Sequence, residues 1–217
     1  MRYVALGDSI TAFRDGVRVY FEWMQEAAGE LTLGDMTNGS VGGWTTADLL
    51  AGLEAKCLQH RPERVTVMLG TNDHAIDKER TEPRVSLSDY AGNLDAIVRR
   101  IRDAGGGPLN GDGMPDVILM TPPYVCTYTN RMGTMTSQAR LLSYCRIVKE
   151  TSERLGTGWI DINAKTAAAT KGDDSMFFDT FTADGDGVHL NSRGHRIVFE
   201  AIREAFASRT QTRQGGW

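Results

Sequence analysis

An apolar run meets a polar turn in the stretch Tyr3-Val4-Ala5-Leu6-Gly7-Asp8-Ser9. The run ends at Gly, Asp and Ser, which are residues that favour turns, and it therefore predicts the first strand of a sheet. Similar short apolar runs predict further strands at Val65–Leu69, Val117–Met120 and Trp159–Ile162. The segment Met36–Asn38 is a candidate for a short second strand.

Helical periodicity fills the intervals between these strands. Tyr90, Leu94, Ile97 and Ile101 recur at helical spacing, and Ser88 is placed to cap their helix. The same pattern predicts helices over Gly16–Gly29, Thr46–Cys57, Gln138–Leu155 and Arg193–Phe206.

Strands that alternate with helices require crossover connections, and such connections make the strands parallel. We therefore expect an α/β fold: a three-layer α/β/α sandwich with a flavodoxin-like five-stranded parallel sheet and helices on both faces. The 217 residues suit a single domain over residues 1–207. We expect a loop rich in Asp and Gly over 171–187, and a flexible polar tail over 208–217.

The composition excludes several classes of protein. A formal net charge of −4 lacks the basic surplus that is typical of a nucleic-acid binder. No apolar run approaches the roughly 18 residues that a membrane span requires. No signal peptide is visible, so we expect either a cytoplasmic protein or a trimmed form of a secreted one.

The cysteines point to neither a disulfide framework nor a metal site. Cys57, Cys126 and Cys145 are widely spaced and odd in number, so we interpret them as reduced structural thiols. A bridge between Cys126 and Cys145 remains an alternative. The Asp- and Gly-rich stretch before His189 does not match the ligand spacing of an EF-hand calcium loop. We expect neither a metal nor a cofactor.

Polar residues that follow the strands are the first candidates for a site, because parallel sheets bind ligands beyond the carboxyl ends of their strands. Ser9 lies on the turn after the first strand and could act as a nucleophile. A Gly-Asp-Ser turn taken alone, however, is usually only a turn or a cap. A catalytic serine also needs a histidine base and donors for an oxyanion.

Each of these partners has a candidate. Asp186 precedes His189 by three residues, so its carboxylate can hold the ring while the other ring nitrogen faces Ser9. The Gly-rich segment Asn38–Thr46 can bring a backbone N–H close to a ligand, and the Asn72 side chain could donate to a developing negative oxygen. Each segment also has a structural interpretation, as an exposed loop histidine or as a turn.

Taken together, the four segments resemble the SGNH hydrolases, also called the GDSL esterase/lipase superfamily. The resemblance runs from Gly7 to about Gly194, with the motifs in the order that the superfamily shows. It implies that Ser9, Asp186 and His189 form a catalytic triad. It also implies that the N–H groups of Ser9 and Gly43 and the side chain of Asn72 form the oxyanion hole.

One position departs from the usual pattern of the superfamily, which often has Asp or Asn where Trp44 stands. Trp44 is a candidate for lining the substrate cleft, with the covering of a helix as its alternative. His74 follows Asn72 closely and is a second candidate for substrate contact, whereas His195 is interpreted as structural. We expect Asp8 and Asp73 to fix loop hydrogen bonds. The Gly-x-Ser-x-Gly elbow of the α/β-hydrolases does not occur in the chain.

The resemblance implies a serine ester hydrolase that works through an acyl-enzyme intermediate. We expect short-acyl esters as substrates, small molecules or carbohydrates, with O-acetyl groups of carbohydrates as the leading physiological hypothesis. The alternatives are a lipase, lysophospholipase or thioesterase of the same superfamily, or a non-catalytic carbohydrate-binding domain on the same fold.

Overall fold

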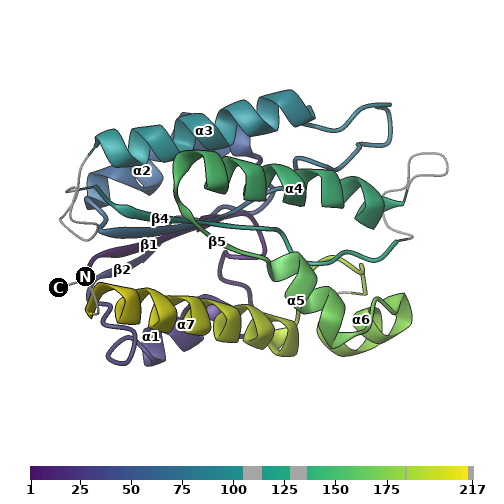
Figure 1. The fold of residues 1–217 in the computed structure, drawn as a ribbon. Coiled ribbons are helices and arrows are strands. Elements are labelled where there is room, and N and C mark those ends of the chain that lie inside the picture. Colours follow the sequence, from purple (N-terminus) through teal and green to yellow (C-terminus); the bar gives the residue numbers. More distant parts are fainter. Residues whose placement is uncertain (105–113, 128–135, 184, 215–217) are drawn as a thin grey trace.

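Five parallel strands form one sheet at the centre of the molecule (Figure 1). The computed structural model describes residues 1–104, 114–127, 136–183 and 185–214. The order of the strands across the sheet is β2-β1-β3-β4-β5, and the register pairs Ala5 with Asn38 on one side and with Thr66 on the other. The strands are β1 (Tyr3–Gly7), β2 (Met36–Asn38), β3 (Arg64–Met68), β4 (Asp116–Met120) and β5 (Gly158–Ile160).

Helices cover both faces of the sheet, as Figure 1 shows, and complete the three-layer sandwich that the sequence predicts. One face carries α2 (Thr46–Lys56), α3 (Leu87–Asp103) and α4 (Ser137–Leu155), with the short 3₁₀ turn η1 (Leu58–His60) after α2. The other face carries α1 (Tyr20–Glu26), α5 (Ile162–Ala169) and α7 (Ser192–Gln214), and α6 (Asp174–Phe181) packs against α7.

The alternation of side chains along β1 explains why the sheet has two cores. Tyr3 and Ala5 are buried in the cluster beneath α1 and α7, whereas Val4 and Leu6 are buried in the cluster beneath α2, α3 and α4. Successive residues of a strand point to opposite faces, so a strand that is apolar throughout must be covered on both sides. The sandwich follows from this pattern.

The structure corrects several of the element boundaries. The N-cap of α3 is Ser86, whose hydroxyl accepts a hydrogen bond from the Asp89 N–H at 3.1 Å, and not Ser88. The helix predicted over Gly16–Gly29 is helical only over Tyr20–Glu26. The last helix continues beyond Phe206 to Gln214, since no Gly or Pro interrupts it before residue 215. Much of the expected tail is therefore helical.

Two helices were not predicted. The first is α5, which begins where the last strand was expected to end. The second is α6, which lies within the segment 171–187 that was expected to be a loop. The Asp173 side chain caps α6 by accepting from the Met176 N–H at 2.7 Å, and Phe177 anchors the helix in the core. The Asp-rich composition that suggested a loop supplies the cap of this short helix.

The cysteines are buried thiols, as their spacing suggested. The alternative of a Cys126–Cys145 bridge is wrong, because the Cys126 Sγ instead donates to the Asp174 carbonyl oxygen at 3.6 Å. Burial raises the pKa of the Cys57 thiol to about 12. Among the described helices, none combines the length and the apolar character that crossing a bilayer requires.

Candidate active site

The loops after β1, β2 and β3 meet at the carboxyl edge of the sheet. The backbone holds the first two loops together, because the Val41 N–H donates to the Gly7 carbonyl oxygen at 3.2 Å. The Asn38 side chain adds a bond to the Thr11 carbonyl oxygen at 2.7 Å. These contacts place the Gly-rich loop after β2 beside the turn that carries Ser9.

The turn after β1 is fixed by its own hydrogen bonds. The Asp8 carbonyl oxygen accepts from the N–H groups of Thr11 and Ala12, and the Asp8 side chain accepts from the Ile10 N–H at 2.9 Å. Gly7 is required at the base of the turn, because a Cβ there would lie only 2.9 Å from the Met68 carbonyl oxygen of β3. Ser9 is thereby held half-buried on a rigid support.

Ser9, His189 and Asp186 form a continuous hydrogen-bonded chain. The Ser9 Oγ lies 2.9 Å from the His189 Nε2, although 180 residues separate the two in sequence. The His189 Nδ1 bonds to the Asp186 Oδ2, and the Asp186 Oδ1 accepts from the N–H groups of Val188 and His189 at 2.8 and 2.9 Å. An Nδ1–H donated to Asp186 leaves Nε2 as the acceptor that faces the serine.

The carboxyl of Asp186 stays ionised across the ordinary pH range. Partial burial alone would raise its pKa, but the hydrogen bonds from the His189 ring and from two backbone N–H groups outweigh that effect. The pKa of Asp186 is held at about 2. A charged Asp186 orients the imidazole and can stabilise the imidazolium that proton transfer would create.

Two backbone N–H groups in the loops around Ser9 are available as donors. Within the described part of the chain, neither the Ser9 N–H nor the Gly43 N–H has an acceptor. The loop after β2 passes close to the serine, since a Cβ on Gly42 would lie 3.8 Å from the Ser9 Cβ. Gly43 has a φ of +81°, a conformation that glycine adopts at little cost and that turns the backbone at this point.

The Asn72 side chain also reaches this site, but both of its amide hydrogens already have acceptors. Its Nδ2 donates to the Trp44 carbonyl oxygen at 3.0 Å and to the Asp8 Oδ2 at 3.3 Å. Asn72 therefore lies next to the turn that carries the nucleophile, as its predicted role requires. To serve an oxyanion, its amide would have to release one of these two acceptors, and the longer bond to Asp8 is the weaker.

Two buried carboxyls support the loops of the site. The Asp73 Oδ1 accepts from the backbone N–H and the hydroxyl of Thr46, at 2.9 and 2.6 Å, and so ties the loop after β3 to the start of α2. Burial raises the pKa of Asp8 to about 7, with the nearby Asp73 charge adding to the effect, and burial raises the pKa of Asp73 to about 6. Their contacts agree with the interpretation of both as loop-fixing groups.

The structure contradicts a substrate contact for His74. The side chain is only 3% exposed, and its ring nitrogens bond to the Ser137 hydroxyl at 2.9 Å and to the Thr71 carbonyl oxygen at 2.6 Å. Burial, aided by the charge of Arg140, lowers the pKa of His74 to about 4. His74 is therefore a neutral structural group. His195 is likewise buried, as expected, and burial lowers its pKa to about 3.

The Trp44 ring packs on helix α2. A Cβ on Gly52 would meet this ring at 2.6 Å, and the Lys56 Nζ lies 5.7 Å from the ring centre. Of the two sequence interpretations, these contacts favour the covering of a helix over the lining of a cleft. The backbone carbonyl of Trp44, rather than its indole, takes part in the site through its bond with Asn72.

A comparison with models of protein families identifies the family of the chain. The model described as the GDSL-like lipase/acylhydrolase family matches residues 5–197. The chain belongs to this family. The sequence-based prediction of an SGNH-type ester hydrolase is confirmed at this level, and the match spans the loops that carry Ser9, Gly43, Asn72 and His189.

Individual relatives of this GDSL-like chain are distant. An uncharacterized lipoprotein, YqeF, from Bacillus subtilis is 28% identical over 183 residues, which cover 78% of this chain and 72% of that protein. An isoamyl acetate-hydrolyzing esterase 1 homolog from Bos taurus is 25% identical over 155 residues, which cover 65% of this chain. The chain spans only 54% of that esterase homolog.

An acetylxylan esterase from Geobacillus stearothermophilus is similar in both sequence and structure. The sequences are 26% identical over 170 residues, which cover 77% of this chain and 69% of that enzyme. Its crystal structure superposes with a TM-score of 0.75 at 22% identity, covering 94% of this chain and 93% of the other. The superposition confirms the α/β fold.

One residue at the GDSL-like site escaped the sequence analysis. The Arg84 Nη1 lies 3.4 Å from the Asn72 Oδ1. Arg84 follows Asn72 by twelve residues in a segment without helical or strand periodicity, so no spacing rule pairs the two. The only local signal is the opposite charge of Asp77, which binds the same guanidinium.

Proposed function

We propose that this chain hydrolyses short-acyl esters through an acyl-enzyme intermediate formed on Ser9. The observation that carries the proposal is the hydrogen-bonded chain from the Ser9 Oγ through the His189 ring to the Asp186 carboxylate. This arrangement activates a serine hydroxyl by placing a base against it and a carboxylate behind the base.

In the first half-reaction, the His189 Nε2 takes the proton of Ser9 while the Ser9 Oγ attacks the ester carbonyl carbon. The negative oxygen that develops is met by the N–H groups of Ser9 and Gly43 and by the Asn72 amide. Collapse of this intermediate breaks the bond to the alcohol, which leaves with the proton from His189. Water then attacks the acyl-enzyme with His189 as base, and Ser9 is regenerated.

The comparisons support acetyl as the acyl group more strongly than they support any particular alcohol. One relative is named for the hydrolysis of isoamyl acetate and another for acetylxylan, so the two names share an acetyl group. The alcohols differ, since one is a small alkyl alcohol and the other a carbohydrate. We therefore propose acetyl esters as the preferred substrates, with carbohydrate O-acetyl groups as the leading physiological class.

The test compares the chain with Ser9→Ala on p-nitrophenyl acetate, butyrate and octanoate, and on acetylated xylo-oligosaccharides. Ser40→Ala is the matched control, because it removes a neighbouring hydroxyl that donates to the Ala5 carbonyl oxygen of β1. Ser9→Ala is expected to lose nearly all activity and Ser40→Ala to keep it. Hydrolysis by Ser9→Ala at the parent rate would refute the assignment of the nucleophile.

The same series decides between the alternatives. A rate that rises with acyl length would favour a lipase or lysophospholipase over the proposed short-acyl enzyme. A thioesterase would hydrolyse a thioester faster than the p-nitrophenyl ester of the same acyl group. A serine-directed phosphonate that labels Ser9, detected by mass spectrometry, is expected for the enzyme and would exclude a non-catalytic carbohydrate-binding domain.

A further inference from the structure

The Asn72 amide lies between groups of opposite polarity. Its Nδ2 faces two acceptors, the Trp44 carbonyl oxygen and the Asp8 carboxyl. Its Oδ1 faces a donor, the Arg84 guanidinium, at 3.4 Å. An amide in such a position has one favoured orientation, because a flip would set its oxygen against two acceptors and its NH₂ against a cation.

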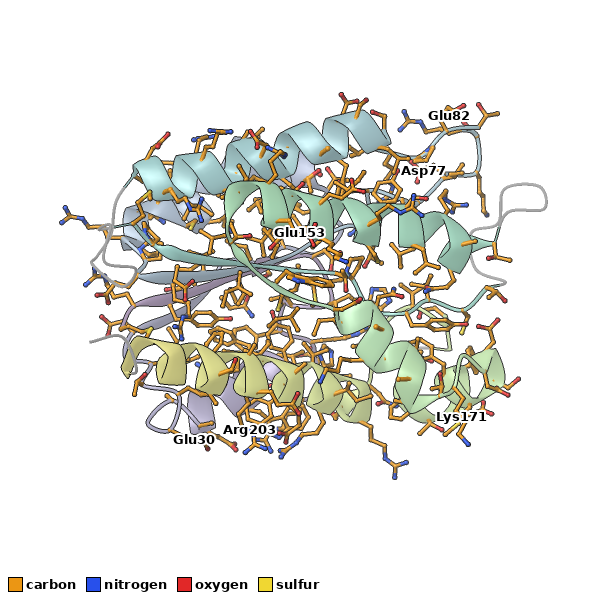
Figure 2. All side chains as sticks on the ribbon, viewed as in Figure 1. Glu30, Asp77, Glu82, Glu153, Lys171 and Arg203 are labelled. Carbon is orange, nitrogen blue, oxygen red and sulfur yellow. The ribbon has the colours of Figure 1, made fainter. Side chains whose placement is uncertain are left out.

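The Arg84 guanidinium is held from its other side by Asp77, which Figure 2 labels on the loop before α3. The Nε and Nη2 of Arg84 donate to the Asp77 Oδ1 at 3.0 and 2.8 Å, which leaves Nη1 for Asn72. The backbone of the loop is also tied down, because the Arg84 N–H donates to the Ala75 carbonyl oxygen and the Val85 N–H to that of Asp73.

We propose that Arg84, anchored by Asp77, is a positioning residue for the oxyanion donor Asn72. The inference rests on the function proposed above. Arg84 acts in two ways. It keeps the Nδ2 of Asn72 on the side of Ser9, and its charge on the amide oxygen draws electron density from the nitrogen, which makes the N–H a stronger donor.

The expected effect is modest, because the contact is long and the guanidinium is partly solvated. The Arg84 side chain is 35% exposed, so water screens its charge. Loss of the contact is expected to lower kcat by about threefold to tenfold, less than the loss of an oxyanion donor itself. The KM should change little, since the donor acts on charge that develops only in the transition state.

The test is a double-mutant cycle on p-nitrophenyl acetate with Arg84→Met, Asn72→Ala and the double variant. Arg84→Met keeps an apolar stem of similar length and removes the donor and the charge. The matched control is Arg99→Met, which removes an exposed cation of α3 that pairs with Asp95 rather than with Asn72 or Asp77. If Arg84 acts through Asn72, its replacement lowers kcat in the parent chain and has no further effect in the Asn72→Ala background.

Three results would overturn the inference: an unchanged kcat in Arg84→Met, an equal fall in the Asn72→Ala background, or a rise in KM with kcat preserved. The last would make Arg84 a substrate contact. If Arg84→Met does not fold, Asp77→Asn provides the second variant, because it loosens the anchor and keeps the arginine. Asp77→Asn should also lower kcat, by a smaller factor than Arg84→Met. An unchanged kcat in Asp77→Asn would count against the proposal.

The activities of the Ser9 and Asn72 variants, set beside those of the Arg84 and Asp77 variants, separate this inference from the proposed function. Loss of activity in Ser9→Ala and Asn72→Ala, with full activity in Arg84→Met and Asp77→Asn, would leave the function standing and refute only the role of Arg84. Full activity in Ser9→Ala would refute the function itself.

Discussion

The most informative substitution at this site is Asn72→Ala, because the structure limits how much the Asn72 amide can contribute. Removal of one oxyanion donor typically costs about 2.7–4 kcal/mol in transition-state stabilisation. In the resting structure, however, the Nδ2 already bonds to Trp44 at 3.0 Å and to Asp8 at 3.3 Å. To meet an oxyanion, it must release one of them, and a hydrogen bond has a net value of about 1 kcal/mol.

Subtracting the value of the released hydrogen bond from the typical cost leaves a net contribution of about 2–3 kcal/mol for the Asn72 amide. At 1.36 kcal/mol per decade, its removal should lower kcat by about 30- to 150-fold. Steady-state kinetics of the parent chain and of Asn72→Ala on p-nitrophenyl acetate measure this fall in kcat. The KM should stay nearly constant, because the amide gains its bond to the substrate oxygen as negative charge develops.

Asn93→Ala is the matched control. Asn93 is another half-buried asparagine, and its amide donates to the Thr46 hydroxyl at 3.1 Å rather than to Trp44 or Asp8. Thermal unfolding of both variants shows whether each is folded at the assay temperature. A folded Asn72→Ala variant that loses less than about threefold in kcat, or no more than Asn93→Ala loses, would refute Asn72 as an oxyanion donor.

Two further predictions concern the loops that support the site. Gly43→Ala meets no atom within 4 Å, so its cost is the left-handed backbone at φ +81°, about 1 kcal/mol, and we expect kcat to fall by up to about tenfold. Because alanine keeps the backbone N–H, an unchanged kcat would mean that the strain does not shift this loop, and it would contradict the prediction. Asp8→Asn tests the buried carboxyl, whose pKa is raised from 3.8 to about 7. Neutral Asp8 favours folding below its unfolded pKa, and this contribution is lost as the pH rises through 7. We therefore expect Asp8→Asn to become more stable relative to the parent chain as the pH rises from about 4 to 8. The difference between the two unfolding free energies, measured by urea denaturation, should grow by on the order of 4 kcal/mol at most. A constant difference across that range would contradict the buried charge.

The layers of this fold and the local half of the site follow from the pattern of residues along the chain. Strands that are apolar on both faces, separated by helical spacing, admit little besides a covered parallel sheet, because periodicity is a property of neighbouring residues. The pairing of Asp186 with His189 is local in the same way, since three residues in one loop suffice to bring a carboxylate to the ring.

Which of the remaining candidate residues contact one another depends on the folded arrangement of the loops. Ser9 and His189 lie 180 residues apart and meet because α7, which follows His189, packs against α1, which follows the turn of Ser9. His74 and Asn72 are two residues apart, yet one is enclosed by packing and the other borders the nucleophile turn. The contact of Arg84 with Asn72 likewise depends on how a loop folds back. Such contacts depend on the long-range closure of loops, which no local pattern of residues encodes.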